Sequence, residues 1–397
     1  MAGRLSLATI GVQDQWLTGE PEFSHFLINF KKHTKFAFDF VESQFDGNID
    51  FGSTIKCRVP NDKGDLIRNF TLKVTLPDPT PDDGGINDIV WSPSIISHMI
   101  DYVELSIGGQ VIQKLTGEYI YIHQQLYNTN DDIDQTLYFL NGHGYQTLSY
   151  QGTYTYYLDL PFYFYRNPSL AIPTCALTKQ QVELTIKLRP LSQVVRNVGG
   201  DGDGIDDVVA DIKKFSVDTE FVYVSDDERN FLMSNPLDYV ITQLQLSKFV
   251  MLPGETKRSV LLGFKHPVKE LFFVSQSDAA VRTNLPTYMN TINRIELRFN
   301  NEVVFNRKTK YLCYEQALRH HINAPLAVSA SKFAMYSFAL HPELPHPTGQ
   351  VNMSRIPHKM CTIEIDPVND TDNNHTRIYA VNYNILRVQW GLAGLKF

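Results

Sequence analysis

Apolar and polar residues alternate along much of this chain, and alternation with a period of two is typical of half-buried β-strands. We expect strands where the pattern is clearest: FTLKVTL (70–76), VELTIKL (182–188), FSVDTEFVYV (215–224), RIELRF (294–299) and CTIEI (361–365). Clusters of Gly, Pro, Asn and Asp lie between such segments, at 77–85, 199–207 and 366–374, and these residue types favour turns. The chain is therefore predicted to be mostly β.

Helical periodicity is scarce. The segment SDDERNFLMSN (225–235) is the clearest helix, because Ser225 can cap it and Glu228, three residues later, can complete a capping box. The segment GEYIYIHQQLY (117–127) is expected to add one or two helical turns.

The segment IDYVELSIGGQVIQKLTGEYIYIHQQL (100–126) aligns without a gap with INRIELRFNNEVVFNRKTKYLCYEQAL (292–318). Each segment reads as a hairpin around a two-residue turn, Gly108-Gly109 in the first and Asn300-Asn301 in the second. A type I′ turn needs positive φ at both central residues, and Gly and Asn tolerate this conformation. The two copies therefore predict the same turn with different residues.

Counting outward from the turns predicts which residues face each other. Leu105 is expected to face Ile112, with Ser106 facing Val111, and Leu297 is expected to face Val304 in the second copy. The aligned positions that are identical are Ile100/Ile292, Glu104/Glu296, Leu105/Leu297, Val111/Val303, Tyr119/Tyr311, Gln124/Gln316 and Leu126/Leu318. A repeat of about 190 residues is too long for a solenoid, so it predicts two similar β-domains in tandem, joined by the 225–235 helix.

Length and composition fit a folded protein with two domains. The chain has 397 residues, 43% of them apolar and 12% aromatic, and single cores stop growing beyond about 250–300 residues. No apolar run approaches the roughly 20 residues of a membrane-spanning helix. The start, MAGRLSLATIGVQDQW, lacks the apolar stretch of a secretory signal, which predicts synthesis in the cytosol. Without a CxxC pair, the cysteines are expected to be free thiols: Cys57, Cys175, Cys313 and Cys361.

Candidate chemistry is weak. Glu104 and Glu296 recur in the repeat, but neither has a His or Asp partner in its motif, so we interpret both as surface or interface carboxylates. His320, His321, His341, His346 and His358 show no metal-ligand spacing. The acidic segment DGDGIDD (201–207) offers oxygen ligands for a cation but lacks the spacing of an EF-hand, and an exposed acidic loop is preferred. We predict no catalytic, cofactor-binding or metal-binding residue.

Charge argues against general nucleic-acid binding, because the formal net charge is −7. The segment KKHTKFAF (31–38) interleaves Lys31, Lys32 and Lys35 with aromatic residues and could touch phosphates. A solvated strand edge is the preferred interpretation.

Four stretches resemble one known family, the double jelly-roll major capsid proteins of nucleocytoplasmic large DNA viruses, which include algal, iridescent and amoebal viruses. The first two resemble its N-terminal arm with the first strand and a strand–loop–strand segment of its first domain. The others resemble the crossover between its domains and its C-terminal signature. These stretches are ATIGVQDQWLTGEPEFSHFLINFKKHTKFAFD (8–39), LDLPFYFYRNPSLAIPTCALTKQQVELTIKL (158–188), FVYVSDDERNFLMSNPLDYVITQLQ (221–245), and LPHPTGQVNMSRI (344–356) with IYAVNYNILRVQWGLAGLKF (378–397).

The resemblance implies an all-β fold of two tandem eight-stranded antiparallel jelly rolls with a short linking helix. The expected organisation is an N-terminal arm at 1–25, a first jelly roll at 26–224, a linker helix at 225–236 and a second jelly roll at 237–397. The implied function is that of a structural major capsid protein without enzymatic activity, which forms a homotrimer. This trimer would be a pseudo-hexagonal capsomer that tiles the icosahedral shell of a double-stranded DNA virus.

The resemblance also implies partners. Neighbouring capsomers and minor capsid proteins under the shell are expected to bind the trimer, and the N-terminal arm is expected to lie near an internal membrane. No specific contact with nucleic acid is expected. The protein would be located in the virion capsid after synthesis and assembly in the host cytoplasm.

Two alternatives stay open at this point. One is a capsid-family paralogue with a minor or vertex role, because the chain is shorter than many family members. The other is a tandem β-sandwich protein that binds or cleaves carbohydrate. The residues Trp16, Trp91 and Trp390 belong to no cluster with paired carboxylates, which disfavours a glycoside hydrolase.

Overall fold

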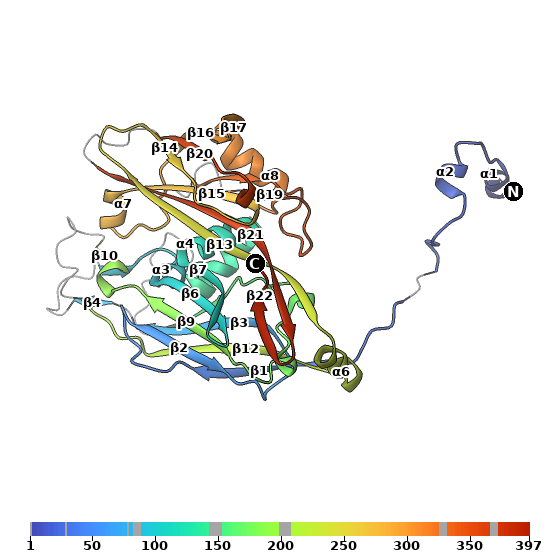
Figure 1. Cartoon of the computed structure of the whole chain (residues 1–397), viewed down its shortest axis with the longest axis horizontal. Helices are drawn as coiled ribbons and strands as arrows, with labels where there is room; N and C mark the ends of the chain where they lie inside the picture. Colours follow the sequence, from blue (N-terminus) through green and yellow to red (C-terminus); the bar gives the residue numbers. More distant parts are fainter. Residues whose placement is uncertain are drawn as a thin grey trace. The chain divides into compact units, whose positions relative to one another are not determined.

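The computed structural model describes residues 2–27, 30–77, 79–81, 89–142, 153–197, 208–324, 332–365 and 372–397. The chain divides into two compact units, Met1–Lys35 and Phe36–Phe397. The smaller unit contains α1 (Ala2–Ala8) and α2 (Gln15–Thr18), and each of its described residues is exposed. The named strands of the described chain all belong to the larger unit (Figure 1).

The first half of the larger unit consists mainly of two four-stranded antiparallel sheets. One has the order β1-β12-β3-β8 and the other the order β2-β9-β6-β7. Their strands are β1 (Phe36–Gln44), β2 (Thr54–Val59), β3 (Leu66–Pro77), β6 (Ile100–Ile107), β7 (Gln110–Thr116), β8 (Thr153–Asp159), β9 (Val182–Leu188) and β12 (Lys214–Val224). Two short pairs lie outside these sheets: β4 (Thr80–Pro81) with β11 (Val208–Val209), and β5 (Ile89–Trp91) with β10 (Val195–Asn197).

The second half has a sheet with the order β13-β21-β15-β18, to which β19 and β22 add at β15 and β21, and a second sheet with the order β14-β20-β16-β17. Their strands are β13 (Leu237–Met251), β14 (Lys257–Leu261), β15 (Pro267–Ser277), β16 (Ile292–Phe299), β17 (Glu302–Lys308), β18 (Ala334–Ser337), β19 (Val351–Asn352), β20 (Lys359–Ile365), β21 (Asn374–Gln389) and β22 (Leu392–Leu395). The five segments that alternate in the sequence all lie in strands: β3, β9, β12, β16 and β20.

The main sheets of both halves have the same topology. Counted in chain order without the short extra strands, one sheet joins strands 1-8-3-6 and the other joins strands 2-7-4-5, in each half. This interleaved antiparallel order is that of a jelly roll. The predicted fold class, two tandem antiparallel jelly rolls joined by a helix, is therefore confirmed. The count of eight strands per roll stays a prediction, because the described residues pair further short strands.

Helices are short and lie mostly between strands. They are α3 (Ile95–Met99), α4 (Gly117–Tyr127), α5 (Tyr138–Asn141), α6 (Asp226–Ser234), α7 (Asp278–Arg282) and α8 (Gln316–His320). Single turns of 3₁₀- or π-helix are η1 (Asp132–Leu137), η2 (Pro168–Leu170), η3 (Thr174–Ala176), η4 (Leu191–Gln193), η5 (Lys310–Glu315) and η6 (Met353–Arg355). The helical prediction for 117–127 is confirmed by α4, and in the second roll η5 and α8 occupy the equivalent place after the hairpin.

The duplicated hairpin is present in both rolls. The φ values are 58° and 82° at Gly108 and Gly109, and 49° and 71° at Asn300 and Asn301, so both turns have the predicted left-handed residues. The predicted pairing of Ser106 with Val111 is also confirmed.

The pairing one step farther from each turn is predicted wrongly. Leu105 faces Gln113 rather than Ile112, and a bulge lies between Leu105 and Ser106. In the second roll the bulge lies at the equivalent place, and Leu297 faces Phe305 rather than Val304. A bulge places one extra residue in one strand, which counting outward from a turn cannot detect. The shared bulge is stronger evidence for two related domains than the sequence identity.

The predicted linking helix is α6, but its predicted capping box is wrong. Ser225 is the N-cap residue and its side chain makes no capping hydrogen bond, and Oε2 of Glu228 has no hydrogen-bond partner. The buried Asp65 stabilises this end instead. Its carboxylate accepts hydrogen bonds from the Val224 N–H at 3.0 Å and from Arg229 at 2.8 and 3.0 Å. A residue distant in sequence therefore anchors the start of α6, through the N–H that precedes the cap residue and through the side chain of Arg229.

The two rolls share apolar packing. One buried cluster fills the first roll and includes side chains of the second roll, among them Phe272, Tyr379, Leu386 and Ala393. A second cluster lies within the second roll. The four cysteines are free, as predicted, and burial raises the pKa of Cys57 to about 11.

The C-terminal strand joins the rolls. Strand β22 pairs with β21, so that Leu395 faces Leu386, and it also contacts β7 of the first roll. The Ala393 N–H donates to Oε1 of Gln180 at 2.7 Å, and the Lys179 N–H donates to the Gly391 carbonyl. Strand β22 therefore packs in the second roll through β21 and also contacts the first roll.

Candidate functional site at the junction between the rolls

The repeated glutamates are half-buried residues of paired strands. Glu104 accepts a hydrogen bond from Lys114 at 2.6 Å across β6 and β7. Glu296 accepts from Asn306 at 2.7 Å across β16 and β17 and also pairs with Arg298. Each glutamate therefore bonds the residue opposite it in an equivalent hairpin, and neither has a second carboxylate as a catalytic partner in these contacts.

The candidate metal ligands remain dispersed. In the described ranges, no group of three His, Cys, Asp or Glu side chains is close enough to hold a metal ion. His321 bonds Glu343, whereas His320 bonds the Leu340 carbonyl. The acidic segment 201–207 lies outside the described residues.

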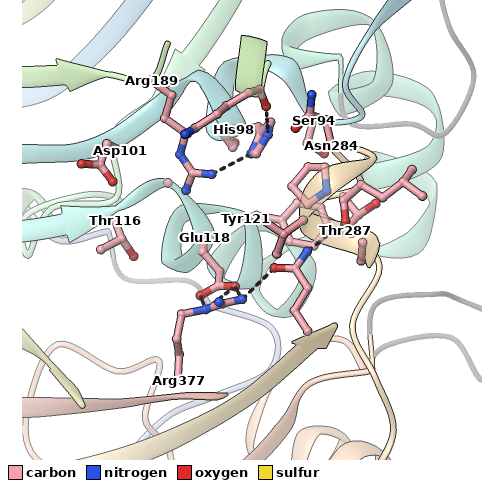
Figure 2. A pocket seen from close by; sticks show the side chains of 18 of the residues that line it. Ser94, His98, Asp101, Thr116, Glu118, Tyr121, Arg189, Asn284, Thr287 and Arg377 are labelled. Atoms are coloured by element: carbon pink, nitrogen blue, oxygen red, sulfur yellow. Dashed lines mark hydrogen bonds and ion pairs between the residues drawn. The ribbon is translucent and has the colours of Figure 1, made fainter. Parts of the chain in front are cut away.

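The most concentrated polar chemistry lies between the rolls. Glu118 lies in the first turn of α4, where a carboxylate is favoured by the helix dipole, and Thr116 caps this helix by accepting from the Tyr119 N–H at 3.2 Å. Arg377 of β21 donates to Glu118 through Nε at 2.7 Å and through a second nitrogen at 2.6 Å (Figure 2). The Tyr379 hydroxyl also donates to Glu118. A bidentate ion pair thus joins the first roll to the second.

Both members of this ion pair are largely buried, with side-chain exposures of 16% for Arg377 and 13% for Glu118. Burial by itself raises the pKa of Glu118, but the charge and hydrogen bonds of Arg377 outweigh it and hold that pKa below its usual value. Burial and the charge of Glu118 raise the pKa of Tyr379, so the phenol stays protonated and donates. Arg377 bonds Gln276 as well, at 2.9 Å. Both members of the pair are therefore charged at neutral pH, and Gln276 of β15 helps to hold Arg377 in place.

A cavity separates the Glu118–Arg377 pair from a histidine and an arginine of the first roll (Figure 2). His98 Nε2 lies 2.8 Å from the Gln193 carbonyl, which can only accept, so Nε2 carries the proton. His98 Nδ1 then accepts from Arg189 at 3.3 Å. Burial lowers the pKa of His98 to about 3, and the charge of Arg189 acts in the same direction. His98 is thus a neutral structural residue that orients Arg189.

A second polar contact between the rolls lies beside His321, whose own carboxylate partners belong to the second roll. Its Nδ1 lies 3.0 Å from Glu343, and its Nε2 lies 3.6 Å from Glu270. The neighbouring Asn323 donates to the Gln125 carbonyl at 3.1 Å at the end of α4, and its own N–H donates to Leu126 at 3.1 Å. These contacts hold the segment after α8 against the first roll.

These junction residues were not found from the sequence. Glu118 aligns with Lys310 in the repeat, so the duplication gives no signal for it. Arg377 lies far along the chain, and the alternating pattern around it indicates a strand without marking Arg377 as a functional residue. The polar residues at the junction attach the two domains by charge-assisted hydrogen bonds, and the nearby His98 is neutral.

Comparison with known proteins accounts for this arrangement. Residues 24–232 match the family profile "Major capsid protein N-terminus", and residues 228–394 match "Large eukaryotic DNA virus major capsid protein". The chain belongs to this family of major capsid proteins. Its sequence is 30% identical over 425 residues to the major capsid protein of Pyramimonas orientalis virus, covering 100% of this chain and 99% of that protein. It is 26% identical to the major capsid protein of Paramecium bursaria Chlorella virus 1, with 100% of both chains covered.

Solved structures agree on the fold of this capsid family. The capsid of Paramecium bursaria Chlorella virus 1, described as a quasi-atomic model, matches with a TM-score of 0.77 at 22% identity, over 94% of this chain and 100% of that chain. The Faustovirus major capsid protein matches with a TM-score of 0.74 at 10% identity, over 96% and 95% of the two chains.

Family membership decides several sequence predictions. The family is structural, so the prediction that the chain is not an enzyme is confirmed, and the carbohydrate-binding alternative is rejected. The location of the capsid protein is the virion capsid. In the described part of the chain, no helix is both long and apolar enough to span a membrane.

Proposed function

We propose that three copies of this capsid protein form a pseudo-hexagonal capsomer that tiles the icosahedral shell of a large double-stranded DNA virus. The observation that carries the proposal is the repeated architecture, with the same sheet order and the same bulged hairpin in both rolls of one compact unit. Three such chains around a three-fold axis present six similar domains. A three-fold object can then fill a six-fold position in a lattice.

The junction supports this proposal physically. A tile must keep its two rolls at a fixed relative orientation, since a variable angle would change its outline. The Glu118–Arg377 pair, the Asn323 contacts and β22 each fasten one roll to the other. Rigid attachment of similar domains favours a shell component over a protein whose domains close around a ligand.

The mass of the purified protein in solution tests the proposal. Native mass spectrometry is expected to show a species of about 136 kDa, three times the 45.4 kDa chain. A protein that stays monomeric across micromolar concentrations would contradict the capsomer.

We also propose that the N-terminal segment 1–25 binds partners inside the shell, such as minor capsid proteins near an internal membrane. Supporting this, the segment exposes large apolar side chains, including Trp16 at 90%, Leu17 at 88% and Phe23 at 72%. Such side chains favour burial against a partner. Deleting residues 2–20 is expected to leave a soluble trimer that does not build shells, and an unchanged shell yield would refute this role.

The domain boundaries 26–224, 225–236 and 237–397 complete the proposal, with assembly in the host cytoplasm. Limited proteolysis should remove the N-terminal segment first and leave both rolls joined. A minor or vertex role is the second candidate. Quantitative mass spectrometry of purified particles separates the two, because the principal shell protein must outnumber every other capsid-family chain.

A further inference from the structure

A cavity of about 260 Å³ lies at the junction and has walls from both rolls. Arg189, His98 and Asp101 line it from the first roll, and Lys248 lines it from β13 of the second roll. Figure 2 shows Arg189 with its guanidinium group between Asp101 and His98, across the cavity from the Glu118–Arg377 pair.

Arg189 has fewer partners than a guanidinium group normally receives. Its side chain makes one hydrogen bond, to Nδ1 of the neutral His98. In the described chain no carboxylate lies within ion-pair distance of Arg189, and the same holds for Lys248, whose side chain is exposed whereas Arg189 is half-buried. Glu118 and Asp101 act on Arg189 through their charges alone, without a direct ion pair, so they repay only part of the hydration that burial removes. Burial accordingly lowers the pKa of Arg189 from its usual value.

The remaining charges leave the cavity positive. Glu118 and Arg377 neutralise each other through their bidentate contact, and His98 is uncharged at neutral pH. Two cations and the single carboxylate of Asp101 then line the rest of the cavity. The imbalance favours an anion and disfavours a metal ion.

We propose that this cavity binds a small oxyanion of the phosphate class, held by Arg189 of the first roll and Lys248 of the second. The planar fork of an arginine matches two oxygens of a phosphate group, and a lysine adds a mobile point charge. Because the two cations belong to different rolls, the bound anion ties the rolls together. The site is independent of the assembly state, since one chain supplies all of its residues.

Thermal unfolding of the full chain in sodium phosphate tests the site, with sodium chloride at equal ionic strength as the reference. A ligand that binds only the folded state raises the Tm with its concentration. We expect the wild-type Tm to rise with phosphate, and above the Kd to rise with the logarithm of the phosphate concentration. A nucleoside monophosphate added in a parallel titration shows whether the site takes free phosphate alone or also a phosphate group on a larger molecule.

Three variants locate the effect. Arg189→Gln is expected to weaken phosphate binding by about tenfold or more, and Lys248→Gln is expected to weaken it less. Lys265→Gln removes an exposed charge outside the cavity and should bind as the wild type does. If Arg189→Gln does not fold, Arg189→Lys keeps the charge without the fork and should bind more weakly than wild type. Absence of a phosphate-specific shift in the wild type, or phosphate binding by the Arg189→Gln and Lys248→Gln variants as tight as that of the wild type, would overturn the proposal.

Discussion

Replacing Glu118 by Gln should weaken the junction between the rolls more than any surface substitution of the same kind. The change keeps the side-chain shape but leaves Arg377 as an unpaired charge that is only 16% exposed. Breaking a buried ion pair from one side typically costs about 3–5 kcal/mol. The free energy of unfolding should fall by an amount in that range.

The chain contains a matched control. Glu104 and Lys114 also form an ion pair with a closest contact of 2.6 Å; Glu104 is 21% exposed, but the Lys114 side chain, which the substitution leaves unpaired, is 47% exposed and stays hydrated. Exposed pairs contribute about 0–1 kcal/mol, so Glu104→Gln should change the free energy of unfolding by no more than that. Comparing this variant with Glu118→Gln therefore separates the effect of burial from the effect of distance.

Denaturant unfolding followed by tryptophan fluorescence and circular dichroism gives the free energies. The double variant Glu118→Leu/Arg377→Met should recover part of the lost unfolding free energy, because it removes both buried charges at once. Equal unfolding midpoints for Glu118→Gln and Glu104→Gln would refute the reasoning that the junction pair is a buried attachment.

The same pair predicts a pH dependence. The folded-state pKa of Glu118 lies below its usual value of 4.5, so its contribution to stability is fully present above that value. The contribution is lost as the pH falls through the folded-state pKa. The difference in stability between the wild type and Glu118→Gln should therefore be large at pH 7 and should shrink in strong acid. A difference that does not change with pH would contradict a charged glutamate.

Three further changes probe other contacts. Replacing Gly108 and Gly109 by Val should lower the unfolding free energy by about 2–4 kcal/mol, from about 1–2 kcal/mol for each left-handed residue, and an unchanged denaturant midpoint would argue against the turn. Deleting residues 395–397 shortens β22 and should reduce trimer yield in native mass spectrometry, whereas a normal yield would show that this contact is dispensable. Asp65→Ala removes the hydrogen bonds that this buried carboxylate accepts and should cost about 1–3 kcal/mol in denaturant unfolding, whereas an unchanged midpoint would show that they are dispensable.

The features that could be predicted from the sequence depend on neighbours in the chain. Alternation marks β3 or β9 because each strand shows one face to a core, and the turn at Asn300-Asn301 follows from backbone preferences of those two residues. The bulge beside Leu105 could not be predicted, since inserting one residue into a ladder leaves no local compositional sign.

The junction could not be predicted for a different reason. Glu118 and Arg377 are brought together only when two complete jelly rolls have formed and packed. The anchoring of α6 by Asp65 has the same origin, because a buried carboxylate from before β3 binds the Val224 N–H and the Arg229 side chain. Contacts between separately folded domains are set by tertiary structure, and a single sequence carries little trace of them.

Electron microscopy of the purified assembly tests the central claim most directly. Class averages and a three-dimensional reconstruction should show a hexagonal outline with three-fold symmetry, in which six β-sandwich densities surround the axis, two from each chain. A particle with a single chain, or a trimer whose two rolls do not alternate around one ring, would contradict the account.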